Sequence, residues 1–447
     1  MKDFNKRLIS LVLPMAFQQF MLAVVSASDA VMVGMLSQDA MSAVSLAGQV
    51  QFVFQLFLAA MTIGTSMFAA QYWGKSDKNA VERILAIVLR VSIPISFAFT
   101  LCTALIPTVL MRCFTPEPLL IKYGADYLQA VCLSYLFCGI SQIYLCIMKN
   151  SERVFQGALI SSVCVILNMI LNAFLIFGLY GMPKLGIVGT AVATVIARAV
   201  ELLWVLFDST NKNRVKIRNT YLLHIDKNLS KEFWKYTNPV LGNELVWGIG
   251  FTMGTVIIGH LNTDAIAANS IINIAKNMVV CFCMGLGTGS GIMIGNELGA
   301  GNLKRAKEYG GKLCQSAIFG GVIAGILLLC ISPLFFTFAN LTKAASEYLK
   351  WMFVISTVSM MGKSINLTTI SGIFCAGGDS KFGFLCDTIV LWCIVVPMGM
   401  FAAFVLKLPV LVIYGIVNLD EVIKLPAVYR NYKKYNWVRD LTVKERM

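Results

Sequence analysis

Long apolar runs alternate with short polar segments along the whole chain. The runs at 84–110, 154–178 and 309–338 each reach the roughly 20 residues with which an α-helix crosses a bilayer. About twelve such spans can be placed, in two sets of six. The first set covers 8–34, 44–71, 84–110, 123–148, 154–178 and 185–207; the second covers 232–259, 266–296, 308–338, 346–372, 381–406 and 408–429. The pattern predicts an all-α membrane protein with lobes at 1–207 and 232–447, joined by a polar linker at 208–231.

An internal repeat relates the two sets of spans. Pro14 matches Pro239 and Gly34 matches Gly259 at a constant offset of 225 residues, with no gap between them. Gly64 and Gly74 match Gly289 and Gly299 at the same offset. An even number of spans per set gives both halves the same orientation, so we expect parallel, pseudo-symmetric six-helix bundles with the substrate path between them.

Composition agrees with a membrane protein: 57% of the residues are hydrophobic, 13% are charged, and the mean hydropathy is +0.74. The net charge of +14 could suggest a nucleic-acid partner, but its distribution points to the lipid bilayer. Basic residues crowd the loops on the side of the N-terminus, the linker and the C-terminal tail. This asymmetry follows the positive-inside rule and predicts cytoplasmic termini in a multi-pass protein of the plasma membrane. The crowded segments contain Lys2, Lys6, Arg7, Lys75, Lys78, Arg83, Lys149, Arg153, Lys304, Arg305, Lys307 and Lys312, with the linker from Lys212 to Lys235 and the tail from Arg430 to Arg446.

The first lobe places few polar groups at membrane depth, and such groups are functional candidates because each is costly when unpaired. Asp29 lies deep in the first span. Asn168 and Asn172 are four residues apart, as are Thr190 and Thr194, so each pair shares a helix face. Carboxylate, amide and hydroxyl oxygens suit Na⁺ or a proton better than a transition metal. The alternative is that the asparagines only cross-link helices.

The second lobe combines acids with bases. Glu244 and Asp387 lie inside spans, and Asn273 and Lys276 belong to a polar stripe on the eighth span. Consecutive helices joined by a short turn would bring Glu244 near Lys276, directly or through Asn273 or a water. Such a pair either holds the bundle together or gates a charge-balanced pocket for zwitterionic or weakly basic amphiphiles.

Several ordered motifs resemble those of the multidrug and toxic compound extrusion (MATE) family of antiporters. The resemblance extends along essentially the whole chain. Its motifs are Asp29-Ala30-Val31-Met32-Val33-Gly34, Ala70-Gln71-Tyr72-Trp73-Gly74, Asn168-Met169-Ile170-Leu171-Asn172, Gly189-Thr190-Ala191-Val192-Ala193-Thr194, Gly295-Asn296-Glu297-Leu298-Gly299-Ala300-Gly301 and Ala376-Gly377-Gly378-Asp379-Ser380.

The resemblance implies a V-shaped pair of six-helix lobes that exports organic compounds in exchange for inward Na⁺ or H⁺. The family's cation site would fall on Asp29, Asn168, Asn172 and Thr190. Many members carry Asp where this chain has Asn172, so the site would contain one carboxylate instead of two and hold one cation or proton. Glu244 resembles an acidic position found in part of the family.

Two other functions fit the residues less well. A flippase for lipid-linked sugars would need a strongly cationic cavity, for which Lys276 and Lys363, with Arg90 and Arg198, are the candidates. An intramembrane enzyme is disfavoured because the chain lacks His-Glu-x-x-His and Gly-x-Ser-x-Gly constellations and has only two histidines. The sequence therefore predicts an efflux antiporter with no cofactor beyond its coupling ion and no metal site. Its expected partners are small organic substrates and the bilayer, with no nucleic acid and no obligate protein partner.

Overall fold

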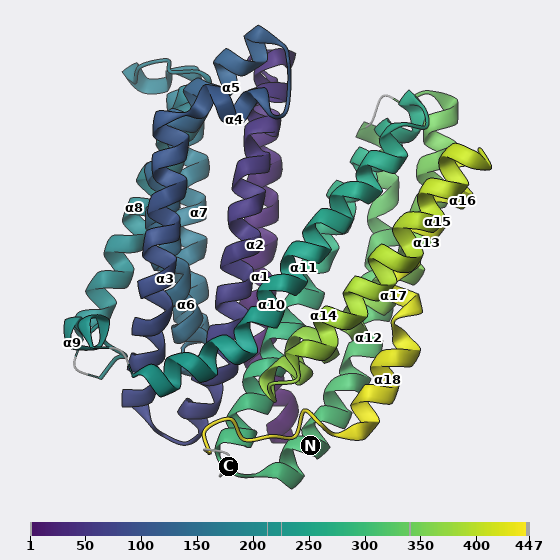
Figure 1. Ribbon diagram of the computed structural model, residues 1–447. Helices are drawn as coiled ribbons and strands as arrows, with labels where there is room; N and C mark the ends of the chain where they lie inside the picture. Colours follow the sequence, from purple (N-terminus) through teal and green to yellow (C-terminus); the bar gives the residue numbers. More distant parts are fainter. Residues whose placement is uncertain (1, 212, 225, 339–340, 444–447) are drawn as a thin grey trace. The chain divides into compact units, whose positions relative to one another are not determined.

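The chain folds into helices connected by short turns. The computed structural model describes residues 2–211, 213–224, 226–338 and 341–443, and these residues contain no strand (Figure 1). Lys212 of the predicted linker and the last residues of the predicted basic tail, including Arg446, lie outside the described residues.

The helices of the first half follow the predicted spans with two breaks. The third span divides into α3 and α4, and the fourth divides into α5 and α6, which meet at an angle of 49°. The elements are α1 (Lys2–Gly34), α2 (Gln38–Gly74), α3 (Lys78–Leu105), α4 (Pro107–Arg112), α5 (Pro118–Val131), α6 (Leu133–Asn150), α7 (Val154–Phe177), η1 (Leu179–Gly181), α8 (Ile187–Thr210) and α9 (Asn219–Leu223).

The second half starts with three long helices and ends in shorter segments. Its last three spans contain π-helical turns or breaks. The elements are α10 (Lys227–Gly259), α11 (Thr263–Gly299), α12 (Leu303–Phe338), α13 (Lys343–Asn366), η2 (Leu367–Phe374), α14 (Ser380–Thr388), η3 (Ile389–Val395), α15 (Val396–Met400), η4 (Phe401–Val405), α16 (Val410–Val417), α17 (Asp420–Ile423) and α18 (Leu425–Lys434).

Within the described residues, nine helices are long and apolar enough to cross a membrane, and the bent pair α5–α6 makes a tenth. The other two predicted spans are present as helices but fail this test of length and composition. One is α13 with η2, and the other is the broken series α16–α18. Large apolar side chains such as Phe207 and Phe319 are exposed on the spans, as expected of surfaces that face lipid.

The internal repeat is visible in the helix bounds. The helix α10 begins and ends 225 residues after α1, and α11 does the same relative to α2. Pro14 and Pro239 lie at the same place inside α1 and α10. The structure thus confirms the repeat that the sequence predicts.

Two compact units divide the chain. Unit 1 contains residues 1–20, 66–76 and 233–447, and unit 2 contains 21–65 and 77–232. Each unit has its own apolar core: Phe54 and Tyr135 are fully buried in unit 2, and Leu349 and Phe353 are buried in unit 1. The boundary between the units does not fall at the linker alone. Residues 1–20 belong to unit 1 because the first half of α1 packs on α11. A Cβ at Gly285 would lie 3.0 Å from the backbone of Ala16.

The ends of α2 and α11 cross within unit 1 through a reciprocal backbone contact. A Cβ added at Gly74 would lie 2.1 Å from the carbonyl oxygen of Asn296, and one added at Gly299 would lie 1.8 Å from that of Gln71. Gln71 and Asn296 are themselves equivalent positions of the repeat. Only glycine permits so close an approach of two backbones.

Both termini of the described chain are fixed near this crossing. The Gln71 side chain, which is fully buried, donates to Arg439 O at 3.1 Å and accepts from Leu441 N at 2.7 Å. The Asn296 amide, oriented to satisfy both neighbours, donates to Ala70 O at 2.7 Å and accepts from Arg7 at 3.0 Å. The N-terminal helix and the C-terminal tail therefore lie at the same end of unit 1, as an even number of spans requires.

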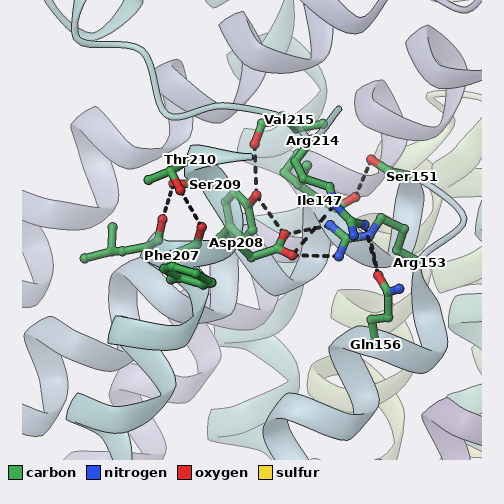
Figure 2. A network of polar contacts seen from close by, with 12 residues as sticks. Ile147, Ser151, Arg153, Gln156, Phe207, Asp208, Ser209, Thr210, Arg214 and Val215 are labelled. Carbon is green, nitrogen blue, oxygen red and sulfur yellow. Dashed lines mark hydrogen bonds and ion pairs between the residues drawn. The ribbon is translucent and has the colours of Figure 1, made fainter. Parts of the chain in front are cut away.

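The polar stretch predicted as a linker packs within unit 2. Figure 2 shows its start, where Arg153 binds both carboxylate oxygens of Asp208 at 2.6 and 2.8 Å. Tyr144 donates to Val215 O at 2.9 Å. Further along, Arg218 forms an ion pair of 2.6 Å with the buried Glu82. Charge-assisted bonds of this kind hold the segment against the helix ends.

Candidate functional site

Five polar residues from three helices are connected by hydrogen bonds in unit 2. Asn172 of α7 donates through Nδ2 to Asp29 Oδ1 of α1 at 2.5 Å. Asn168, one turn earlier on α7, donates to Thr194 Oγ1 of α8 at 3.3 Å. Thr190 lies one turn before Thr194 and accepts its hydroxyl through the backbone carbonyl at 3.0 Å. Of the residues predicted for the cation site, side-chain hydrogen bonds join Asp29, Asn172 and Asn168, and Thr190 is connected to them only through Thr194 of the same helix.

Two oxygens of this cluster are buried and have no hydrogen-bond partner among the residues that the structure describes. They are Asn172 Oδ1 and Thr190 Oγ1. Asn172 is 0% exposed and Thr190 is 3% exposed. Buried oxygens are rarely left unpaired, because each costs about 1–3 kcal/mol in that state. With the Asp29 carboxylate, they form a set of hard oxygen donors of the kind that binds Na⁺, and the carboxylate can also carry a proton.

A chain of buried and half-buried charges runs through unit 1. Lys424, only 3% exposed, lies 2.8 Å from Asp387 Oδ1 and 3.4 Å from Asp420 Oδ2. Next to Asp420, Glu421 accepts from Asn366 Nδ2 at 2.8 Å. Lys424 thus joins α14 to the segment between α17 and α18, and it neutralises carboxylates that could not otherwise remain ionised away from water.

A cavity of about 110 Å³ lies beside these charges, also within unit 1. We call it the lysine cavity because Lys276 of α11 and Lys363 of α13 both line it. Lys276 Nζ donates to Asn418 Oδ1 at 3.0 Å. The wall of the lysine cavity also includes aromatic, amide, acidic and apolar groups: Trp247, Asn269, Asn273, Asn277, Val280, Leu391, Val395, Tyr414, Asn418, Asp420 and Glu421.

The residues predicted for a gate in the second lobe separate into two groups. Lys276 and Asn273 line the cavity, whereas Glu244 and Asp387 do not. Among the described residues, no ion pair within 4.0 Å joins Glu244 to Lys276, and Lys276 Nζ instead donates to Asn418 Oδ1, between α16 and α17. The predicted meeting through Asn273 or a water stays a prediction.

Sequence reasoning missed Lys424, Asn418 and Tyr414. A signal for Lys424 was present, since it follows Asp420 by four residues and an acid–base pair at that spacing shares a helix face. Asn418 and Tyr414 gave no such signal. They lie one turn apart at the end of α16, where both contact Lys276.

Comparison with known proteins identifies the family. The family model MatE matches residues 14–174 and 239–401, once in each half of the repeat and over more than half of the chain. The chain belongs to the MATE family.

Relatives and solved structures agree with this MATE assignment. The chain is 21% identical to the uncharacterized transporter YisQ of Bacillus subtilis, over 98% of this chain and 96% of that protein. It is 22% identical to the probable multidrug resistance protein YoeA of the same organism, over 90% and 87%. Its fold matches the MATE transporter VcmN of Vibrio cholerae in the bent form, with a TM-score of 0.85, 18% identity and 98% coverage of each chain.

These findings establish a multi-pass membrane transporter of the MATE family, with the all-α fold of its relatives. The two matches of the MatE model begin at Pro14 and Pro239, which are equivalent positions of the repeat. The predicted family and fold class are thus confirmed.

Proposed function

We propose that this MATE transporter is an antiporter that exports amphiphilic organic compounds, cationic or zwitterionic, in exchange for inward Na⁺ or H⁺. The observation that carries the proposal is the Asp29 cluster, where one carboxylate lies beside buried oxygens that have no partner in unit 2. An ion bound there would satisfy those oxygens, and its departure would leave them unpaired again. Binding and release of the ion therefore change the stability of the cluster, which is what coupling requires.

One monovalent cation or one proton fits the cluster better than a divalent ion. Asp29 supplies the single negative charge, and the other contributors, Asn168, Asn172 and Thr190, are neutral. Among the residues that the structure describes, no group of three or more His, Cys, Asp or Glu side chains could hold a metal. A divalent cation would keep an uncompensated charge in this buried site.

We also propose a plasma-membrane location with both termini in the cytoplasm. Support comes from basic residues at the start of α12, the end of unit 1 near which the N-terminal Phe4 and the C-terminal Trp437 both lie. Phe4 packs on Tyr309 with ring centroids 5.0 Å apart, and Trp437 lies against Gly310. The neighbouring Arg305, Lys307 and Lys312 agree with the positive-inside rule.

The flippase alternative gains little from the structure. Arg198, a candidate for a cationic cavity, is bound to Glu201 at 3.1 Å, and Arg90 is exposed. The lysine cavity is also lined by Asp420 and Glu421, and these acids would repel a pyrophosphate.

The direct test uses the full chain in proteoliposomes. A Na⁺ gradient and a pH gradient are imposed separately, with the membrane potential clamped at zero, and movement of a cationic dye and of a zwitterionic dye is followed by fluorescence. We expect one of the two ion gradients to drive the dye against the dye's own concentration gradient. Movement that responds to neither gradient would contradict the antiport proposal.

A further inference from the structure

The lysine cavity brings two half-buried ammonium groups to one space. Lys276 and Lys363 extend from neighbouring helices, and each lies against an aromatic ring. Lys276 Nζ is 5.8 Å from the ring centroid of Tyr414, and Lys363 Nζ is 5.7 Å from that of Trp247. Ring faces attract cations and keep the stems extended, so both ammonium groups are held at the cavity.

Neither lysine is neutralised by a carboxylate at contact distance. In the described part of the chain, no ion pair within 4.0 Å involves Lys276 or Lys363. Each ammonium has three donors, yet Lys276 donates to Asn418 alone and Lys363 has no hydrogen bond among the described residues. Among the described residues, both ammonium groups therefore keep donors that a ligand in the cavity could use, beside the amide side chains of Asn269, Asn273 and Asn277.

The acids of the cavity have partners of their own. Asp420 binds Lys424 at 3.4 Å, and Glu421 accepts from Asn366 at 2.8 Å. They act on the lysines only from a distance, which lowers the cost of keeping two cations in a buried space. The same acids would repel a second negative charge on a ligand, so a dianion such as a phosphate ester is disfavoured.

Size and lining restrict the ligand further. A volume of about 110 Å³ is smaller than the 300–1,000 Å³ typical of a pocket that encloses a whole drug-sized molecule. It admits an anionic group and the atoms next to it. The apolar and aromatic wall, which includes Trp247, Val280 and Leu391, suits a hydrophobic body attached to that group.

We propose that the lysine cavity binds the carboxylate, or an equivalent singly charged anionic group, of an amphiphilic organic compound. Lys276 and Lys363 donate to the anionic group, and the rings of Trp247 and Tyr414 contact the adjoining apolar atoms. That this compound is also the exported substrate rests on the function proposed above, whereas the binding itself does not.

Binding is tested with the purified full chain in detergent. The probe is dansylglycine, and its matched neutral control is dansylglycine methyl ester; both are followed by fluorescence anisotropy. We expect the acid to bind at least about tenfold more tightly than the ester, as charge-assisted hydrogen bonds imply. Equal affinities for acid and ester in the wild-type chain would overturn the proposal without any mutation.

Variants then assign the effect to the cavity. Lys276→Gln and Lys363→Gln should each weaken acid binding about tenfold or more and leave ester binding unchanged. Lys276→Arg keeps the charge and should retain most of the preference. Lys304→Gln, at an exposed site in the same unit, is the matched control. Size-exclusion profiles verify that each variant is folded. If the folded Lys276→Gln and Lys363→Gln variants both still prefer the acid, the assignment to this cavity is overturned.

A transport arm separates this inference from the antiport proposal. Asp29→Asn should bind dansylglycine as the wild type does but lose gradient-driven movement of the probe. If the wild-type chain binds the acid selectively but moves neither it nor the cationic and zwitterionic dyes under either gradient, the site stands and the antiport proposal fails. If the chain moves a cationic dye under a gradient but does not prefer the acid, the antiport proposal stands and the lysine cavity is not an anion site.

Discussion

Asn172 donates a hydrogen bond of 2.5 Å to Asp29, joining α7 to α1 within unit 2. The amide nitrogen thereby occupies one carboxylate oxygen, while the amide oxygen is buried without a partner. A carboxylate at position 172 could not donate in this way. The hydrogen bond from Asn172 therefore stabilises the single carboxylate of the cluster, that of Asp29.

Asp29→Asn should abolish ion-coupled transport. The substitution keeps the shape of the side chain but removes the only negative charge in the cluster, so neither a cation nor a titrating proton is retained. The measurement is dye movement in proteoliposomes under a Na⁺ or pH gradient, after matching protein levels. Asp39→Asn, at an exposed position of the same unit, should behave as the wild type. Parental rates in the Asp29 variant would show that coupling occurs elsewhere.

Asn172→Asp should strengthen retention of the coupling ion. Two adjacent carboxylates disfavour double ionisation, so the pair holds one proton or one monovalent cation more firmly. We expect half-maximal transport at a lower Na⁺ concentration if Na⁺ is the driver, or proton-dependent transport that persists to higher pH. Asn219→Asp, which is exposed on α9, controls for charge alone. An unchanged dependence on both ions would count against the one-acid interpretation.

Lys424→Met should destabilise unit 1 severely. Lys424 is the cation bound to both Asp387 and Asp420, and removing one partner of a buried ion pair costs about 3–5 kcal/mol. The effect is measured as the temperature at which the purified chain loses its monodisperse size-exclusion peak. The exposed Lys350→Met provides the control. Adding Asp387→Asn should restore part of the loss, and a stable single variant would contradict the assigned role.

Glu244→Gln and Lys276→Met should have additive effects. Lys276 is bound to Asn418 rather than Glu244, and residues without a direct contact or shared partner couple by less than about 0.5 kcal/mol. A double-mutant cycle scored by thermal stability in detergent checks this prediction. A coupling well above that limit would indicate that the pair forms in another state of the transporter.

Gly299→Ala should prevent close packing of α11 against the end of α2. The new Cβ would lie 1.8 Å from the Gln71 carbonyl oxygen, an overlap that only a backbone shift could relieve. We expect a large fall in folded yield. Gly48→Ala, inside α2 and with nothing within 4 Å of the new Cβ, should be neutral or stabilising through helix propensity. Equal yields for the two variants would show that the crossing tolerates separation.

Local patterns in the sequence predict the spans, the repeat and the composition of the Asp29 cluster. Asn168 and Asn172 share a face of one uninterrupted helix, so their mutual placement follows from helix geometry alone. The surroundings of Lys276 could not be obtained in this way. They depend on a break at Asn418 and on π-helical turns in the preceding spans, which change the register by amounts that hydropathy does not encode. The division of α1 between the units likewise depends on the contact between Ala16 and Gly285, which are far apart in sequence.

The reciprocal contact of Gly74 with Asn296 and of Gly299 with Gln71 has the form of a homodimer interface enclosed in one polypeptide. In such an interface each contact occurs twice, and the same patch serves both partners. Here the two copies of the patch are no longer identical, because Gln71 binds the C-terminal tail through Leu441 whereas Asn296 binds the N-terminal helix through Arg7. Because the two copies belong to one chain, they need not be identical, and each can bind a different segment. One geometric contact now secures both ends of the chain.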